Sequence, residues 1–182
     1  LGFFEWPTDK SYRKSLACFV QPSHPIVQHL VLDAVAPLKK LHDIRSFTHL
    51  IKMDSTDKAD SALESLYETL KEKYEIHYAL QPPSFERDYQ VIRPPHRVLS
   101  GTNEKKGKGT CIDLALLISS CLENIHLQPV IIFTKENHNT LHAIVGCWKQ
   151  ITERFELLLT NKERLREVIE KKQILCVEVT GF

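Results

Sequence analysis

The spacing of hydrophobic residues predicts two long helices in the middle of the chain. Between residues 57 and 73 apolar positions recur at intervals of three and four, which predicts an amphipathic helix that begins at Asp57 or Asp60. These apolar positions are Ala62, Leu63, Leu66, Tyr67 and Leu70. Residues 111–123 are apolar almost all round, and such a helix is buried.

Apolar runs after the second helix predict strands. They cover residues 130–134, 140–148 and 174–180, and a charged surface helix is expected at 161–172. A central helix followed by antiparallel strands predicts an α+β fold.

The N-terminal third is predicted to contain one helix and a polar, irregular segment. A helix is predicted from His24 to Leu38, with Ser23 as its N-cap, and residues 41–57 are expected to be irregular. The apolar side chains of the helix need burial. We therefore expect residues 1–57 to form an extension that packs on a core formed by residues 58–182.

Charge and cysteine content narrow the possible classes of function. The formal net charge is +1 over 182 residues, so no nucleic-acid partner is expected. No apolar stretch is long enough to cross a bilayer, because residues 111–123 contain Asp113 and Glu123. The five cysteines are odd in number and lack CxxC spacing, which favours free thiols and a cytoplasmic location. The chain starts with Leu1, so we expect it to be part of a longer protein.

Cys111 stands out as a candidate nucleophile. Thr110 and Asp113 fit a capping box, which puts Cys111 at the first position of the buried helix. Free N–H groups and the helix dipole at that position stabilise a thiolate, so a lowered thiol pKa is expected. Gly107 and Gly109 leave room for a substrate backbone. The alternative is that Cys111 is a small core residue, as expected for Cys121, Cys147 and Cys176.

A nucleophilic cysteine needs a base and a group that orients that base. His142 lies near the start of an apolar strand and is the candidate base, with His138 as the fallback. Glu178 lies in the apolar segment 174–180, where a carboxylate needs a partner, and it is the candidate orienting acid. Asn139 is a weaker candidate for that role. The alternatives are a core histidine with its hydrogen bonds satisfied and an outward-facing glutamate.

Three segments in this order resemble one family. They are GTCIDLALL at 109–117, LHAIVG at 141–146 and VEVT at 177–180. Together they resemble the transglutaminase-like superfamily, and more narrowly its bacterial members, over residues 58–182. The resemblance implies a papain-like α+β core with Cys111, His142 and Glu178 as the catalytic triad. Two departures are the Glu in place of the commoner Asp and a charged insertion at 149–173.

The resemblance implies thiol-dependent acyl transfer on a protein or peptide substrate, by hydrolysis or transglutamination and without a cofactor. The Cys111 N–H is one expected oxyanion donor, and Gln90 is a candidate for a side-chain donor. A catalytically silent peptide-binding module on the same fold is the alternative. A metal site formed by Cys111, His138 and His142 is a third possibility, although two histidines four residues apart on a strand do not share a helix face.

Overall fold

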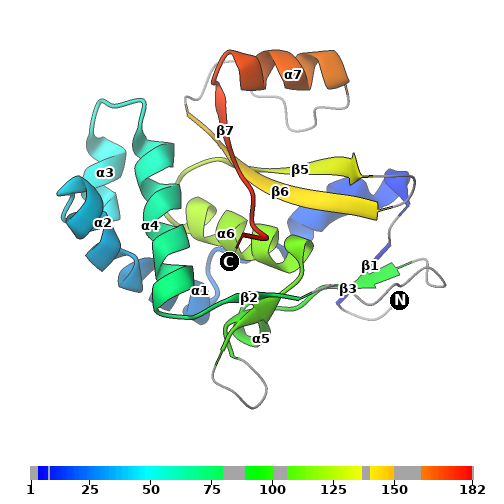
Figure 1. The fold of residues 1–182 in the computed structure, drawn as a ribbon, viewed down its shortest axis with the longest axis horizontal. Coiled ribbons are helices and arrows are strands. Elements are labelled where there is room, and N and C mark those ends of the chain that lie inside the picture. The colour runs from blue at the N-terminus through cyan, green and yellow to red at the C-terminus, as the bar shows by residue number, and fades with distance from the viewer. Residues whose placement is uncertain are drawn as a thin grey trace.

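The structure is a computed structural model that describes residues 4–7, 9–79, 89–100, 106–136, 140–149 and 161–181. Within these residues the chain forms helices, one three-stranded sheet and two small two-stranded sheets, which confirms the α+β class (Figure 1). In the described part of the chain no helix is both long and apolar enough to cross a membrane.

A buried helix and an antiparallel sheet form the centre of the fold (Figure 1). The helix is α6 (Cys111–Asn124), which begins where the sequence predicts and is buried over almost its whole length. The sheet has the order β5 (Pro129–Glu136), β6 (Thr140–Trp148) and β7 (Ile174–Val177), with antiparallel neighbours throughout.

The two faces of β6 are covered by different helices. Ala143, Val145 and Cys147 are fully buried in the main core together with the apolar residues of α6. Trp148 belongs to a second, smaller cluster with Val168 of α7 (Lys162–Glu170) and Ile174 of β7. This alternation along the strand follows from the two-residue repeat of β structure.

The last strand is shorter than the sequence predicts. It was expected to span residues 174–180, but β7 ends at Val177. The Glu178 carboxylate accepts hydrogen bonds from the backbone N–H of Thr180 at 2.9 Å and from its hydroxyl at 2.8 Å. Such local side-chain bonds compete with strand pairing and turn the chain.

The predicted helix at 24–38 is two helices, α1 (Pro25–Asp33) and α2 (Val35–His42). Pro37 explains the break, because it has no N–H to donate to the Asp33 carbonyl four residues earlier and its ring clashes with that carbonyl. The predicted cap, Ser23, was also wrong. His24 is the N-cap, and its Nδ1 accepts a hydrogen bond from the Ile26 N–H at 3.1 Å.

The stretch 41–57, predicted to be irregular, contains the short helix α3 (Phe47–Lys52). Ser46 caps it by accepting a hydrogen bond from the His49 N–H, and Phe47 and Leu50 are buried beneath it. The amphipathic helix predicted at 57–73 is confirmed as α4 (Lys58–Glu72).

The N-terminal helices share one core with α6. Leu30 and Leu38 are fully buried in the same cluster as Leu66 of α4 and Leu114 of α6. The helices α1 and α2 thus shield apolar side chains of α4 and α6 from water, which is the physical reason for their packing.

The remaining elements are short, and β1 (Glu5–Pro7) and β3 (Tyr89–Val91) lie at one edge of the molecule (Figure 1). The strand β1 pairs antiparallel with β3, and β2 (His77–Tyr78) pairs parallel with β4 (Lys108–Gly109). Two short helices complete the described chain, the 3-10 helix η1 (Lys10–Phe19) and α5 (Pro95–Leu99).

Candidate active site

The start of α6 is built as the sequence predicts. Thr110 is the N-cap, its hydroxyl accepts the Asp113 N–H at 3.4 Å, and the Asp113 carboxylate accepts the Thr110 N–H at 3.0 Å. This reciprocal pair is a capping box. Cys111 is therefore the first residue of the helix, which confirms that part of the prediction.

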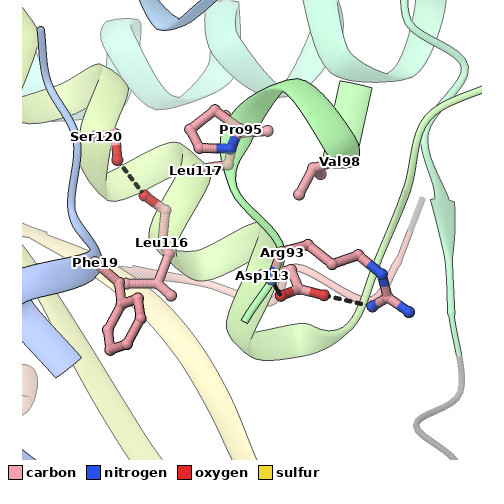
Figure 2. A pocket seen from close by; sticks show the side chains of 8 residues that line it. All are labelled: Phe19, Arg93, Pro95, Val98, Asp113, Leu116, Leu117 and Ser120. Carbon is pink, nitrogen blue, oxygen red and sulfur yellow. Dashed lines mark hydrogen bonds and ion pairs between the residues drawn. The ribbon is translucent and has the colours of Figure 1, made fainter. Parts of the chain in front are cut away.

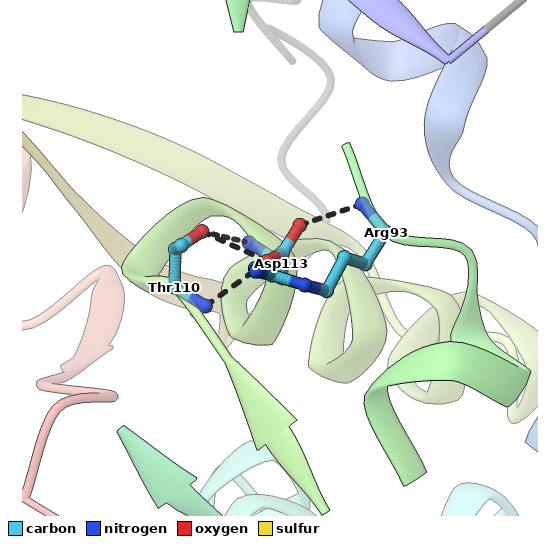
Figure 3. Close-up of polar contacts among 3 residues, drawn as sticks. All are labelled: Arg93, Thr110 and Asp113. Carbon is cyan, nitrogen blue, oxygen red and sulfur yellow. Dashed lines mark hydrogen bonds and ion pairs between the residues drawn. The ribbon is translucent and has the colours of Figure 1, made fainter. Parts of the chain in front are cut away.

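Asp113 also binds Arg93, a contact that was not predicted from the sequence. Its side chain is fully buried, and its two oxygens accept hydrogen bonds from the Arg93 backbone N–H at 2.8 Å and the Arg93 guanidinium at 2.7 Å (Figure 3). With the two bonds from Thr110, the carboxylate has four donors. It therefore ties the segment after β3 to the first turn of α6. One indication of this contact was present in the sequence, because an Asp within a buried helix needs a partner for its carboxylate.

The Cys111 thiol is buried, with only 4% of the residue exposed. Burial raises the pKa of Cys111, while the backbone N–H groups of Ala143 and Ile112 donate to the sulfur and partly oppose the rise. The carboxylates of Asp113 and Glu178 add to it. The predicted lowering of this pKa was wrong, because loss of hydration outweighs the helix terminus.

His142 and Glu178 form a pair in the structure. The His142 Nε2 is 2.7 Å from a Glu178 carboxylate oxygen, although the two residues are 36 positions apart. Burial raises the pKa of Glu178, but hydrogen bonds from His142 and Thr180 outweigh burial and lower it overall. His142 directly precedes Ala143, whose backbone N–H acts on the Cys111 sulfur, and the charge of Glu178 also acts on this thiol, so the His142–Glu178 pair lies in the neighbourhood of Cys111.

The C-terminal segment that carries Glu178 is anchored to α4. The Tyr67 hydroxyl donates to the Gly181 carbonyl at 2.9 Å, across 114 positions of sequence. Val179, between Glu178 and this anchor, is fully buried. The position of the carboxylate thus depends on contacts at both ends of a short segment.

Gln90 is buried in β3, with 6% of the residue exposed, and its Nε2 has no hydrogen-bond partner among the described residues. It pairs across the strands with Trp6 of β1. The Trp6 ring stacks on Phe133 of β5 with centroids 5.7 Å apart. Buried amides normally have partners, so this N–H is a free donor in the strand that leads to Arg93, which is bonded to Asp113 of α6.

The glycines before Cys111 have a structural role. A Cβ at Gly107 would clash with the Ile76 side chain and lie 2.8 Å from the Val98 carbonyl oxygen, and one at Gly109 would lie 3.0 Å from Leu114. Their missing side chains therefore serve internal packing, and the predicted room for a substrate backbone stays a prediction.

The remaining predictions concern two alternative site residues, a possible metal site and the other cysteines. His138 and Asn139 lie outside the described residues, so the fallback base and the rival orienting group are not placed. Among the residues that are described, no group of three or more His, Cys, Asp and Glu side chains could hold a metal ion. Cys121 and Cys147 are buried core residues, and all five cysteines are free thiols.

A small pocket lies near the first turns of α6 (Figure 2). It has room for about one water molecule. Its lining consists of Phe19, Arg93, Pro95, Val98, Asp113, Leu116, Leu117 and Ser120. None of the three candidate catalytic residues lines it, so it is not the place where a substrate meets Cys111.

Comparison of the chain with protein-family models, with curated proteins and with solved structures finds no match in any of the three. The functional assignment therefore depends on the residues and contacts described above.

Proposed function

We propose that this chain catalyses thiol-dependent acyl transfer on amide bonds, on a core of papain-like or transglutaminase-like arrangement. Cys111 is the nucleophile, His142 the base and Glu178 the orienting acid. The observation that carries the proposal is the 2.7 Å contact between His142 Nε2 and Glu178, whose charge acts on the thiol of Cys111 at the N-terminus of α6. A base held by a third group next to a nucleophile is the arrangement that such catalysis requires.

The contact also sets the tautomer of the imidazole. When Nε2–H donates to the Glu178 carboxylate, Nδ1 of His142 carries the free lone pair. Because burial raises the pKa of Cys111, its resting form at neutral pH is the thiol. His142 therefore acts as a general base that removes the thiol proton during attack, instead of stabilising a thiolate formed beforehand.

The proposed reaction has two halves. The sulfur attacks the carbonyl carbon, an S–C bond forms, and the thiol proton passes to His142 Nδ1. The tetrahedral intermediate then collapses, the C–N bond breaks, and the amine leaves with the proton from His142. Water attacks the resulting thioester, gives a proton to His142, and releases the acid and the thiol. A second amine in place of water gives transglutamination.

The oxyanion of the intermediate needs donors. The Cys111 backbone N–H lies at the first position of α6, where helix N–H groups have no partner within the helix. The unpartnered Nε2 of Gln90 is the proposed side-chain donor. The Arg93–Asp113 bonds support this role, because they hold the segment after Gln90 against the helix that carries Cys111.

The proposed substrate is a protein or peptide, the proposed location is the cytoplasm, and the chemistry needs no cofactor. The burial of Cys111 favours a second candidate, a peptide-binding module in which the thiol is never acylated.

Acylation by p-nitrophenyl acetate separates these candidates. We expect an acetyl group on Cys111, located by peptide mass mapping after acid quench, and none there in Cys111→Ala. At neutral pH the His142→Ala variant should acylate about a hundredfold more slowly, because it lacks the general base. The two rates should converge as pH rises towards the raised pKa of the thiol, where the thiolate forms without help.

The matched control is His77→Ala, which removes an exposed histidine on β2 and should leave the rate unchanged. Acetylation confined to other residues, with Cys111 unmodified at every pH, would refute acyl transfer and favour the binding module. Added amine that accelerates loss of the acetyl group would identify transfer in preference to hydrolysis.

A further inference from the structure

Two buried hydrogen-bond donors near the proposed site lack acceptors. They are Gln90 Nε2 and Arg13 Nε, and neither has a partner among the residues that the structure describes. Leaving such groups buried and unpaired is unfavourable, and this applies to the whole of the buried Gln90 amide and to the Nε atom of the half-buried Arg13. Two of them in one neighbourhood indicate a ligand that carries acceptors.

The neighbourhood is defined by one aromatic stack. The Trp6 and Phe133 rings are stacked at 9° to one another, and the Arg13 guanidinium lies 5.9 Å from the centre of the Phe133 ring. Trp6 also donates from its indole N–H to the Tyr12 carbonyl, directly before Arg13. Gln90 is the cross-strand partner of Trp6, so their side chains lie on the same face of the small sheet. Both donors therefore flank the same pair of rings.

This stack lies one strand away from the nucleophile. Phe133 of β5 is the cross-strand partner of Ala143 of β6, and the N–H of Ala143 donates to the Cys111 sulfur. A substrate bonded to that sulfur can extend across β6 towards the Trp6–Phe133 stack within the length of about one or two residues.

We propose that Arg13, with Gln90 beside it, binds a carboxylate of the substrate, so that the preferred acyl donor is an acidic peptide. This inference rests on the proposed acyl-transfer function and names its substrate class. The planar guanidinium fork of an arginine matches a carboxylate in geometry and in charge. In the described part of the chain it forms no ion pair, and its contact with Phe133 does not supply the acceptor that Nε needs. A carboxylate supplies acceptors for Arg13 Nε and for one N–H of the Gln90 amide, whose second N–H remains for the proposed oxyanion.

Alkylation of Cys111 with three small probes tests this. N-iodoacetylglycine carries a free α-carboxylate, N-iodoacetyl-aspartic acid α-amide carries a side-chain carboxylate, and N-iodoacetylglycinamide is neutral. In each case the sulfur bonds to the methylene carbon, iodide leaves with the electron pair of the C–I bond, and the thiol proton passes to His142. Rates are measured on Cys111 by peptide mass mapping.

We expect one acidic probe to react with Cys111 about tenfold faster than the neutral probe, as a charge-assisted contact allows. The acidic probe that reacts faster shows whether the site prefers an α-carboxylate or a side-chain carboxylate. The preference should be lost in Arg13→Gln and partly retained in Arg13→Lys, which keeps the charge and loses the fork. Lys14→Gln removes the neighbouring exposed cation on η1 and should leave the preference intact. Urea unfolding checks that each variant is folded.

The outcomes separate the two proposals. Equal labelling by all three probes that still depends on His142 would overturn the carboxylate site and leave acyl transfer standing. A preference for acidic probes that persists in Arg13→Gln would also overturn it, because the charge then comes from elsewhere. Failure of every probe to label Cys111 in the folded protein would overturn both proposals.

Discussion

Replacing Asp113 by Asn tests how strongly the start of α6 is tied to the segment that follows β3. The carboxylate accepts the Arg93 N–H on one oxygen and the Thr110 N–H on the other. Asn has the same shape but only one acceptor oxygen. In either orientation of the amide, one of these two backbone N–H groups therefore faces an NH₂ group and loses its acceptor.

The magnitude follows from the burial of each group. One buried N–H without an acceptor costs about 1–3 kcal/mol. The ion pair with Arg93 is lost as well, but the Arg93 side chain is 35% exposed, so water solvates the freed guanidinium and the further loss is about 1 kcal/mol. We therefore expect Asp113→Asn to lower the free energy of unfolding by about 2–4 kcal/mol, a large share of the stability of a typical domain.

Urea unfolding followed by circular dichroism measures this loss from the transition midpoint and slope. Asp54→Asn is the matched control, because Asp54 is exposed and such substitutions change stability by about 0.5 kcal/mol or less. If Asp113→Asn were as stable as this control, the four-donor arrangement around the carboxylate would be refuted.

Two further predictions concern the parts that hold Glu178 and β6 in place. Tyr67→Phe removes the hydroxyl that donates to the Gly181 carbonyl, so the Thr180 amide should exchange its hydrogen with solvent faster, and unchanged exchange would show that this anchor does not restrain the segment. Gly146→Ala would place a Cβ 2.8 Å from the Leu175 carbonyl oxygen, so we expect it to lower the free energy of unfolding by about 1–3 kcal/mol. Gly181→Ala, where the nearest atom is 3.5 Å away, is the control in urea unfolding, and an equal effect at both glycines would contradict this explanation.

Local sequence patterns predicted the parts of the fold that depend on nearby residues. The capping box at Thr110 and the apolar pattern of residues 111–123 located α6 to within one residue of its end. The same holds for β6, whose observed span matches the predicted 140–148. These elements form where cap chemistry, periodicity and burial all favour the same structure.

Features that depend on distant contacts were missed. The helix α3 is stabilised by the burial of Phe47 and Leu50 against the rest of the core. The mostly polar sequence of residues 41–57 does not indicate this contact. The bond between Arg93 and Asp113 joins residues 20 positions apart, and the sequence indicated only that a buried carboxylate needs a partner. The pairing of His142 with Glu178 was anticipated from residue types alone, while its 2.7 Å geometry depends on the register of β6 and β7.

The thiol pKa shows why a local rule can give the wrong sign. A helix N-terminus acts on Cys111 through a few partial charges, and this effect is strongest where water does not compete. The same exclusion of water removes the hydration that a thiolate would have, and that loss is larger at a residue with 4% exposure. The capping box in the sequence reveals the stabilising effect of the helix N-terminus. The loss of hydration arises only from the packing of β6 on α6, which the sequence does not show directly. A protonated resting thiol makes the proposed catalysis depend on His142 at neutral pH, so the pH at which His142→Ala recovers the wild-type rate measures which of the two effects is larger.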